Sequence, residues 1–97
     1  MTEADVRVAL HEVIDPELGI NIVDLGLVRA IDVDGANLRV SMIMTTPACP
    51  LRDYLQDLVE STVASRLPGV QDVVVDIAEE PAWTADMMSE AARRQLE

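Results

Sequence analysis

The chain has 97 residues, one cysteine, and only one tryptophan and one tyrosine as aromatic residues, so its core must be aliphatic. Asp and Glu number 18 against 7 Lys and Arg, which gives a net charge of −11. A surface this acidic repels phosphate backbones and anionic lipid, which excludes nucleic acid and membrane as expected partners. The length predicts a single domain over residues 1–97, and a lone cysteine that cannot form an internal disulfide favours a reducing, cytoplasmic location.

Apolar residues at helical spacing predict a first helix over residues 2–14, with Thr2 and Asp5 in a capping arrangement. Asp15-Pro16 ends this helix, because a residue before proline disfavours helical torsions. The following segment, 16–26, contains two glycines and an apolar centre. We predict a loop that packs down onto the core instead of crossing the surface.

The rest of the chain predicts two strands joined by an Asp34-Gly35 turn, then a helix, a third strand and a last helix capped by Thr84. These elements are expected at residues 27–34, 38–44, 51–67, 70–77 and 85–96. The order is therefore α-β-β-α-β-α. A helical crossover between the second and third strands makes them parallel, so the predicted fold class is a small two-layer α/β sandwich with a mixed three-stranded sheet. The lateral order of the strands stays open.

The chain's only cysteine, Cys49, lies in the stretch Thr-Thr-Pro-Ala-Cys-Pro at residues 45–50. If Pro50 occupies the first turn of the following helix, Cys49 falls at or near its N-cap. The dipole and unpaired N–H groups there lower a thiol pKa and favour the thiolate, which binds metal and attacks electrophiles. Thr45 and Thr46 supply hydroxyl donors on the same loop. A buried cysteine that only packs is the alternative.

A complete metal site within one chain is not expected, because zinc and iron–sulfur sites need several Cys or His ligands. The one histidine, His11, lies off the apolar stripe of the first helix and is interpreted as solvated. Asp24 sits between apolar residues, where a carboxylate is costly unless bonded. We favour a structural role for Asp24, capping loop N–H groups, over a chemical one. A metal held by Cys49 would need ligands from another chain.

Three separated stretches resemble the SufT/PaaD-like family of metal–sulfur cluster assembly factors. They are DPELGINIVDLGLV at 15–28, TTPACP at 45–50, and the tail with Pro81, Trp83 and residues 87–96. The resemblance implies a fold related to the C-terminal cluster-assembly domain of NifU-like proteins. It also implies a part in iron–sulfur protein maturation. The chain carries no P-loop ATPase, so it is most similar to stand-alone, SufT-type members.

By the same resemblance, the family's reactive cysteine corresponds to Cys49, its loop aspartate to Asp24 and its threonine to Thr45. Thr46 stands where NifU-like carriers have the first cysteine of a Cys-x-x-Cys pair. One thiol in place of two favours an adaptor over a carrier. Any iron–sulfur cluster would then be transient or held between subunits, with Cys49, Thr45, Thr46 and Asp24 as its supporting residues and a homodimer as one way to share it.

Three functions are thus predicted in decreasing order. The first is a non-enzymatic maturation factor that works with cluster-assembly machinery and client apoproteins. The second is an interaction module in which Cys49 is structural and the tail docks a partner through Trp83, Met87 and Met88. The third is a thiol redox enzyme, ranked last because the chain has no resolving cysteine.

Overall fold

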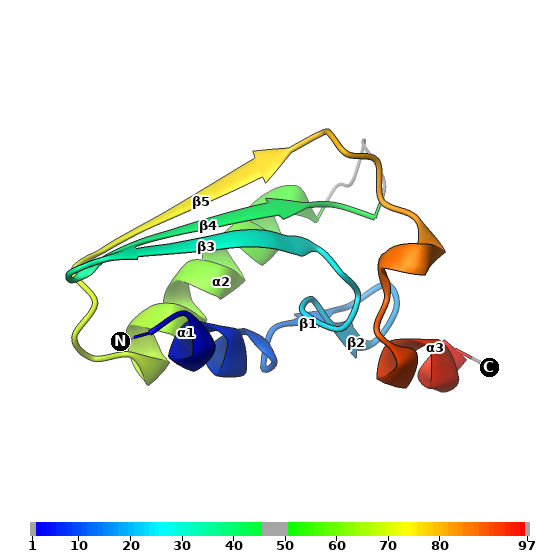
Figure 1. Cartoon of the computed structure of the whole chain (residues 1–97), viewed down its shortest axis with the longest axis horizontal. Helices are drawn as coiled ribbons and strands as arrows, with labels where there is room; N and C mark the ends of the chain where they lie inside the picture. Colours follow the sequence, from blue (N-terminus) through cyan, green and yellow to red (C-terminus); the bar gives the residue numbers. More distant parts are fainter. Residues whose placement is uncertain (1, 46–50, 97) are drawn as a thin grey trace.

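The computed structural model describes residues 2–45 and 51–96. In chain order its helices and strands are α1 (Glu3–Leu10), β1 (Ile14–Asp15), β2 (Ile20–Asn21), β3 (Val28–Asp34), β4 (Asn37–Ile43), α2 (Arg52–Arg66), β5 (Asp72–Ala78), the 3-10 turn η1 (Ala85–Met87) and α3 (Glu90–Leu96). The predicted α/β fold with a mixed three-stranded sheet is confirmed (Figure 1).

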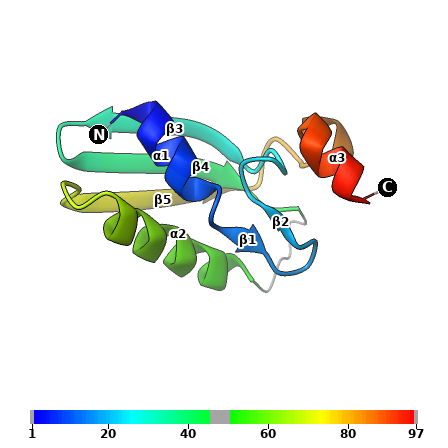
Figure 2. The same ribbon diagram turned by 90° about the horizontal axis from the view of Figure 1, so that it is seen from below.

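The main sheet has the order β3-β4-β5, which the sequence left open. β3 and β4 pair antiparallel through the hairpin, and β4 and β5 pair parallel, as the helical crossover requires. α1 and α2 lie on the same face of this sheet (Figures 1 and 2). Between the two layers lies an aliphatic core that includes Val6, Leu10, Val40, Leu55 and Val59.

α1 has the predicted cap: Asp5 N–H donates to Thr2 Oγ1 at 3.2 Å, and Thr2 N–H donates to Asp5 Oδ2 at 3.0 Å. The helix ends at Leu10, four residues before the predicted end. The reason is that Ile14 and Asp15 are extended and pair with Asn21 and Ile20 in the small β1–β2 hairpin. This hairpin is an addition to the predicted α-β-β-α-β-α order, because two-residue strands carry no periodicity to detect.

Residues 22–27 return from β2 to the main sheet with their apolar side chains inward. Ile22, Leu25 and Leu27 are fully buried, which confirms that this loop packs onto the core. Its turns are closed by backbone bonds, Leu25 N–H to Asn21 O at 3.1 Å and Leu27 N–H to Ile22 O at 3.0 Å. A mainly apolar segment, interrupted by Asp24, thus forms a buried loop here and not a strand.

The single last helix predicted over 85–96 is wrong. The chain forms the turn η1, becomes extended at Met88 (φ −70°, ψ 147°) and restarts as α3. Thr84 stands at the N-cap of η1 without a side-chain hydrogen bond, whereas Ser89 Oγ accepts a bond from Ala92 N–H at 3.2 Å. Among the described residues, no helix has the length and apolarity needed to span a membrane.

Candidate functional site around Asp24

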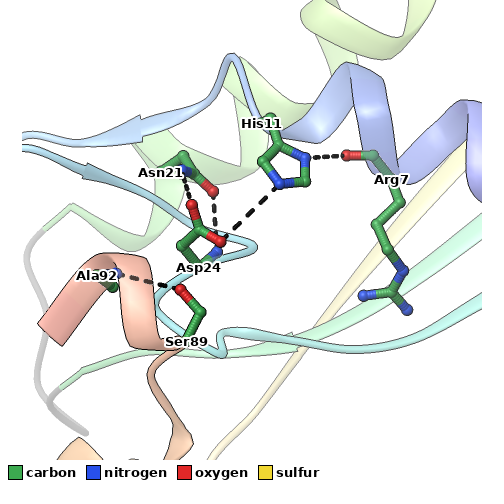
Figure 3. Close-up of polar contacts among 6 residues, drawn as sticks. All are labelled: Arg7, His11, Asn21, Asp24, Ser89 and Ala92. Atoms are coloured by element: carbon green, nitrogen blue, oxygen red, sulfur yellow. Dashed lines mark hydrogen bonds and ion pairs between the residues drawn. The ribbon is translucent and has the colours of Figure 1, made fainter. Parts of the chain in front are cut away.

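Asp24 belongs to the loop after β2 and is held in place by Asn21. The Asn21 side chain uses both ends of its amide: Nδ2 donates to Asp24 Oδ2 at 2.7 Å, and Oδ1 accepts from Asp24 N–H at 2.9 Å. This pair of bonds fixes the carboxylate relative to its own backbone (Figure 3). The side chain of Asp24 keeps 24% of its surface exposed, so the carboxylate is both oriented and accessible.

His11 faces this carboxylate, which sequence reasoning missed. Its Nε2 lies 4.0 Å from Asp24 Oδ1, and its Nδ1 lies 2.8 Å from the backbone oxygen of Arg7, one turn back in α1 (Figure 3). The side chain is 45% exposed, which agrees with the prediction of a solvated histidine. No pattern in the sequence signals this approach, because it depends on how α1 packs beside the loop.

The backbone of the same loop anchors the C-terminal segment. Asp24 O accepts from Ser89 N–H at 2.7 Å, and Leu25 O accepts from Trp83 Nε1 at 2.7 Å. Both contacts join residues about sixty positions apart in the chain. The segment 81–96 therefore lies against the 22–27 loop, at the end of the molecule where Figures 1 and 2 show α3 beside the β1–β2 hairpin.

Trp83, Met87 and Met88, the predicted partner-binding residues, are partly buried and pack against the hydrophobic core. Each thus has a structural role in holding the C-terminal segment. A role in docking stays a prediction, and part of each side chain remains available for it because none of the three is fully buried.

Of the predicted residues on the 45–50 loop, Thr45 is described, and it lies half-buried just beyond β4. Thr46, Cys49 and Pro50 lie outside the described residues. The following helix starts later than predicted: Leu51 is its N-cap, with φ −93° and ψ 6°, and Arg52 is its first residue. The predictions that Pro50 occupies the first helical turn and that Cys49 falls at or near the N-cap lie outside the described residues. The apolar periodicity alone could not separate Leu51 as a cap from Leu51 as a helical residue.

Asp15 is a second carboxylate that the sequence did not single out. It is 2% exposed, and among the described residues it is the polar or charged side chain that is buried. Its Oδ1 accepts from Glu17 N–H at 2.8 Å, while its backbone oxygen accepts from Gly19 N–H at 2.7 Å. Both bonds close the turn of the β1–β2 hairpin, so Asp15 is a turn-forming residue. The Asp-Pro pair was the signal.

A metal ion or iron–sulfur cluster held within one chain needs several ligand side chains that converge on one point. Within residues 2–45 and 51–96, no group of three or more His, Cys, Asp or Glu side chains converges. The chain has one thiol, and biological clusters are held by several. The donor set therefore fits a cluster only if Cys49 shares it with ligands from another molecule.

Comparison with known proteins decides the family. The family model described as "Iron-sulfur cluster assembly protein" matches residues 3–77. The chain belongs to this family. The resemblance predicted from three sequence motifs is thereby confirmed, and the match ends before the segment that Trp83 and Ser89 anchor.

Members of the iron–sulfur cluster assembly family resemble the chain along nearly its whole length. The Fe-S protein maturation auxiliary factor of Porphyromonas gingivalis is 42% identical over 97 residues, covering 98% of this chain and 90% of that protein. The auxiliary factor SufT of Staphylococcus aureus is 46% identical over 85 residues, covering 87% and 96%. The crystal structure of a domain of unknown function, DUF59, from Bacillus anthracis aligns with TM-score 0.94 at 34% identity, covering 97% and 90%.

Proposed function

We propose that this protein is a maturation factor for iron–sulfur proteins that acts in the cytoplasm without catalysing a reaction. It works as an adaptor or carrier that helps to deliver clusters to client apoproteins, which are its partners together with the assembly machinery. The observation that carries the proposal is membership of the iron–sulfur cluster assembly family, with similarity over most of the chain to proteins named Fe-S protein maturation auxiliary factors.

Cys49 is the proposed point of contact with the cluster, because it is the chain's only thiol and thiolates are the usual cluster ligands. One thiol per chain makes the bound cluster transient, or shared with a second copy or a partner protein. Thr45, Thr46 and Asp24 are the proposed supporting residues. Asp24 is the member of this set whose orientation the structure describes in full, through its bonds to Asn21.

The test is complementation of a strain that lacks the protein. The specific activity of a cluster-dependent enzyme is measured with the parent chain, with Cys49→Ala, and with Ser41→Ala as a control on a half-buried polar side chain of β4. We expect the parent and Ser41→Ala to restore activity and Cys49→Ala to fail. The amount of folded protein is matched by immunoblot and circular dichroism. Full restoration by Cys49→Ala shows that the thiol has no central role.

A docking-only module is the second candidate, and the anchored C-terminal segment is the observation that favours it. Trp83, Met87 and Met88 leave part of their surface exposed on a segment held to the 22–27 loop. In this case Cys49→Ala restores activity, whereas Met88→Ala lowers binding to a cluster-assembly partner without lowering thermal stability enough to explain the loss. Pull-down with the purified machinery distinguishes the two candidates.

A further inference from the structure

His11 Nε2 and Asp24 Oδ1 face each other between α1 and the loop after β2. When His11 is neutral, both atoms are hydrogen-bond acceptors, for the following reason. The backbone oxygen of Arg7 can only accept, so the 2.8 Å contact places the imidazole proton on Nδ1. Nε2 then carries a lone pair, and it lies 4.0 Å from the carboxylate atom Asp24 Oδ1. Two electron-rich atoms in this arrangement attract a cation or a hydrogen-bond donor between them.

The His11 ring and the Asp24 carboxylate are each oriented by a second hydrogen bond, as metal ligands in proteins commonly are. Metal-binding histidines commonly donate their other ring N–H to a backbone carbonyl, as His11 does to Arg7. Metal-binding carboxylates are commonly hydrogen-bonded through their second oxygen, as Asp24 Oδ2 is to Asn21 Nδ2 at 2.7 Å. Among the described residues, the hydrogen bond that the Asp24 carboxylate accepts is on Oδ2, and none is donated to Oδ1. That oxygen is therefore available.

We propose that His11 Nε2 and Asp24 Oδ1 form a two-ligand site for a divalent first-row transition-metal ion such as Zn²⁺. An imidazole nitrogen favours such ions over Mg²⁺ and Ca²⁺, which prefer oxygen ligands. Tetrahedral zinc, with bonds of about 2.0–2.2 Å, needs its nitrogen and oxygen ligands about half an ångström closer than the 4.0 Å observed here. Metal binding at this site therefore requires the half-exposed His11 side chain and the Asp24 carboxylate to move closer by that amount.

The site is open, because the described part of the chain adds no third His, Cys, Asp or Glu ligand. Water or a bound molecule completes the coordination, which is the arrangement that distinguishes open from closed zinc sites. The net charge of −11 raises the local concentration of cations at this accessible position. The site shares Asp24 with the residues proposed to support the cluster, but it does not involve Cys49. Zinc binding measured in a chain that lacks the thiol therefore tests the site separately from the proposed cluster function.

The chain's single histidine makes the test direct, since His11 contributes the only imidazole signals in an NMR spectrum. The full chain carrying Cys49→Ser, which removes the competing thiol, is titrated with Zn²⁺ at pH 8 and followed by ¹⁵N–¹H correlation of the ring. We expect Nδ1 to be the protonated nitrogen before addition, and the Nε2 resonance to shift saturably with Zn²⁺. An equal concentration of Mg²⁺ leaves the ring signals unchanged.

Three variants in the same background assign the ligands by calorimetric Zn²⁺ titration. His11→Gln and Asp24→Asn are expected to weaken the site at least tenfold, and Asn21→Ala about tenfold or more through lost orientation of Asp24. Glu12→Gln is the matched control, because Glu12 neighbours His11 but pairs with Arg66; its affinity stays within twofold of the parent.

Three outcomes would overturn the site. One is a ring protonated on Nε2, which would make Nε2 a donor to Asp24. Another is no Nε2 shift on addition of Zn²⁺. The third is an unchanged affinity in both His11→Gln and Asp24→Asn, which would assign the zinc to scattered surface carboxylates. His11→Gln keeps the test decisive if Asp24→Asn does not fold, because His11 is exposed at the helix end.

Discussion

Gly26 lies directly against the backbone carbonyl of Met87, and no other residue type fits there. A Cβ built on Gly26 would stand 2.3 Å from that oxygen, and the glycine has φ +80°. Two backbone segments more than sixty residues apart thus touch without an intervening side chain. Together with Trp83 to Leu25 and Ser89 to Asp24, this contact fixes the C-terminal segment on the 22–27 loop.

Gly26→Ala is expected to lower the free energy of unfolding by about 2–4 kcal/mol, because it adds a steric clash to an unfavourable left-handed backbone. The matched control is Gly19→Ala. Gly19 has φ +69° but no atom within 4 Å of the added methyl, so it loses only about 1–2 kcal/mol. Urea denaturation followed by circular dichroism measures both. Equal losses would mean that the contact with Met87 is not tight in solution.

Trp83→Phe tests the indole hydrogen bond to Leu25 O, which is 2.7 Å long. Phenylalanine keeps an aromatic ring but cannot donate, so stability should fall by about 0.5–1.5 kcal/mol, the usual net value of one such bond. Trp83→Ala also loses the packing of the ring against the core and should fall further. Thermal denaturation of the parent and both variants ranks the three proteins by stability. A Phe variant as stable as the parent would contradict this role for the bond.

Leu55→Ala tests the core between α2 and the sheet. Leu55 is 0% exposed, so its truncation should cost about 2–5 kcal/mol through lost burial and a residual cavity. The neighbouring residue on the same helix serves as control: Tyr54 is 52% exposed, and Tyr54→Ala should change stability by no more than about 0.5 kcal/mol. The comparison uses chemical denaturation of both purified variants. A larger loss at Tyr54 than at Leu55 would reverse the assigned orientation of α2.

Asp15→Ala removes the buried acceptor that Glu17 N–H uses in the hairpin turn. The expected loss of stability is about 1–3 kcal/mol, because a polar backbone group loses its partner. Asp15→Asn keeps a side-chain carbonyl oxygen at the same place and should lose less. Amide hydrogen exchange at Glu17 provides the local readout. The exchange rate should rise more in Asp15→Ala than in Asp15→Asn. Identical exchange in the parent and both variants would show that this bond does not protect the turn.

Much of the architecture was predictable because it depends on local patterns. The 3–4 spacing around Leu55, Val59 and Val63 predicts the buried stripe of α2, and all three are fully buried. Alternation at Val73, Val75 and Ile77 predicts the inward face of β5, opposite Leu38, Val40 and Met42 of β4. The Thr2–Asp5 cap and the Asp34-Gly35 turn are also readable from a few adjacent residues. A periodic or capping signal of this kind needs no knowledge of the rest of the chain.

The candidate site was predictable only in part. Asp24 stood out because a carboxylate lies inside an apolar run. The predicted role was to cap loop N–H groups, whereas among the described residues the carboxylate accepts its hydrogen bond from the side-chain amide of Asn21. The approach of His11 to Asp24 left no trace in any pattern, because it depends on how α1 packs beside the loop. Residues thirteen positions apart meet there by tertiary packing and not by helical spacing.

The sequence by itself determined the two helices and three strands of the main α/β layer, the parallel pairing enforced by the crossover, and the family that the motifs indicate. The tertiary structure decided the lateral order of the strands, the break at Met88 and the pairing of Asp24 with His11. It also decided how residues 81–96 pack against the 22–27 loop. The physical reason is that each of these depends on contacts between residues far apart in the chain. Gly26 is the simplest example. A larger residue is excluded there by the backbone carbonyl of Met87, which lies close to Gly26 only in the folded chain.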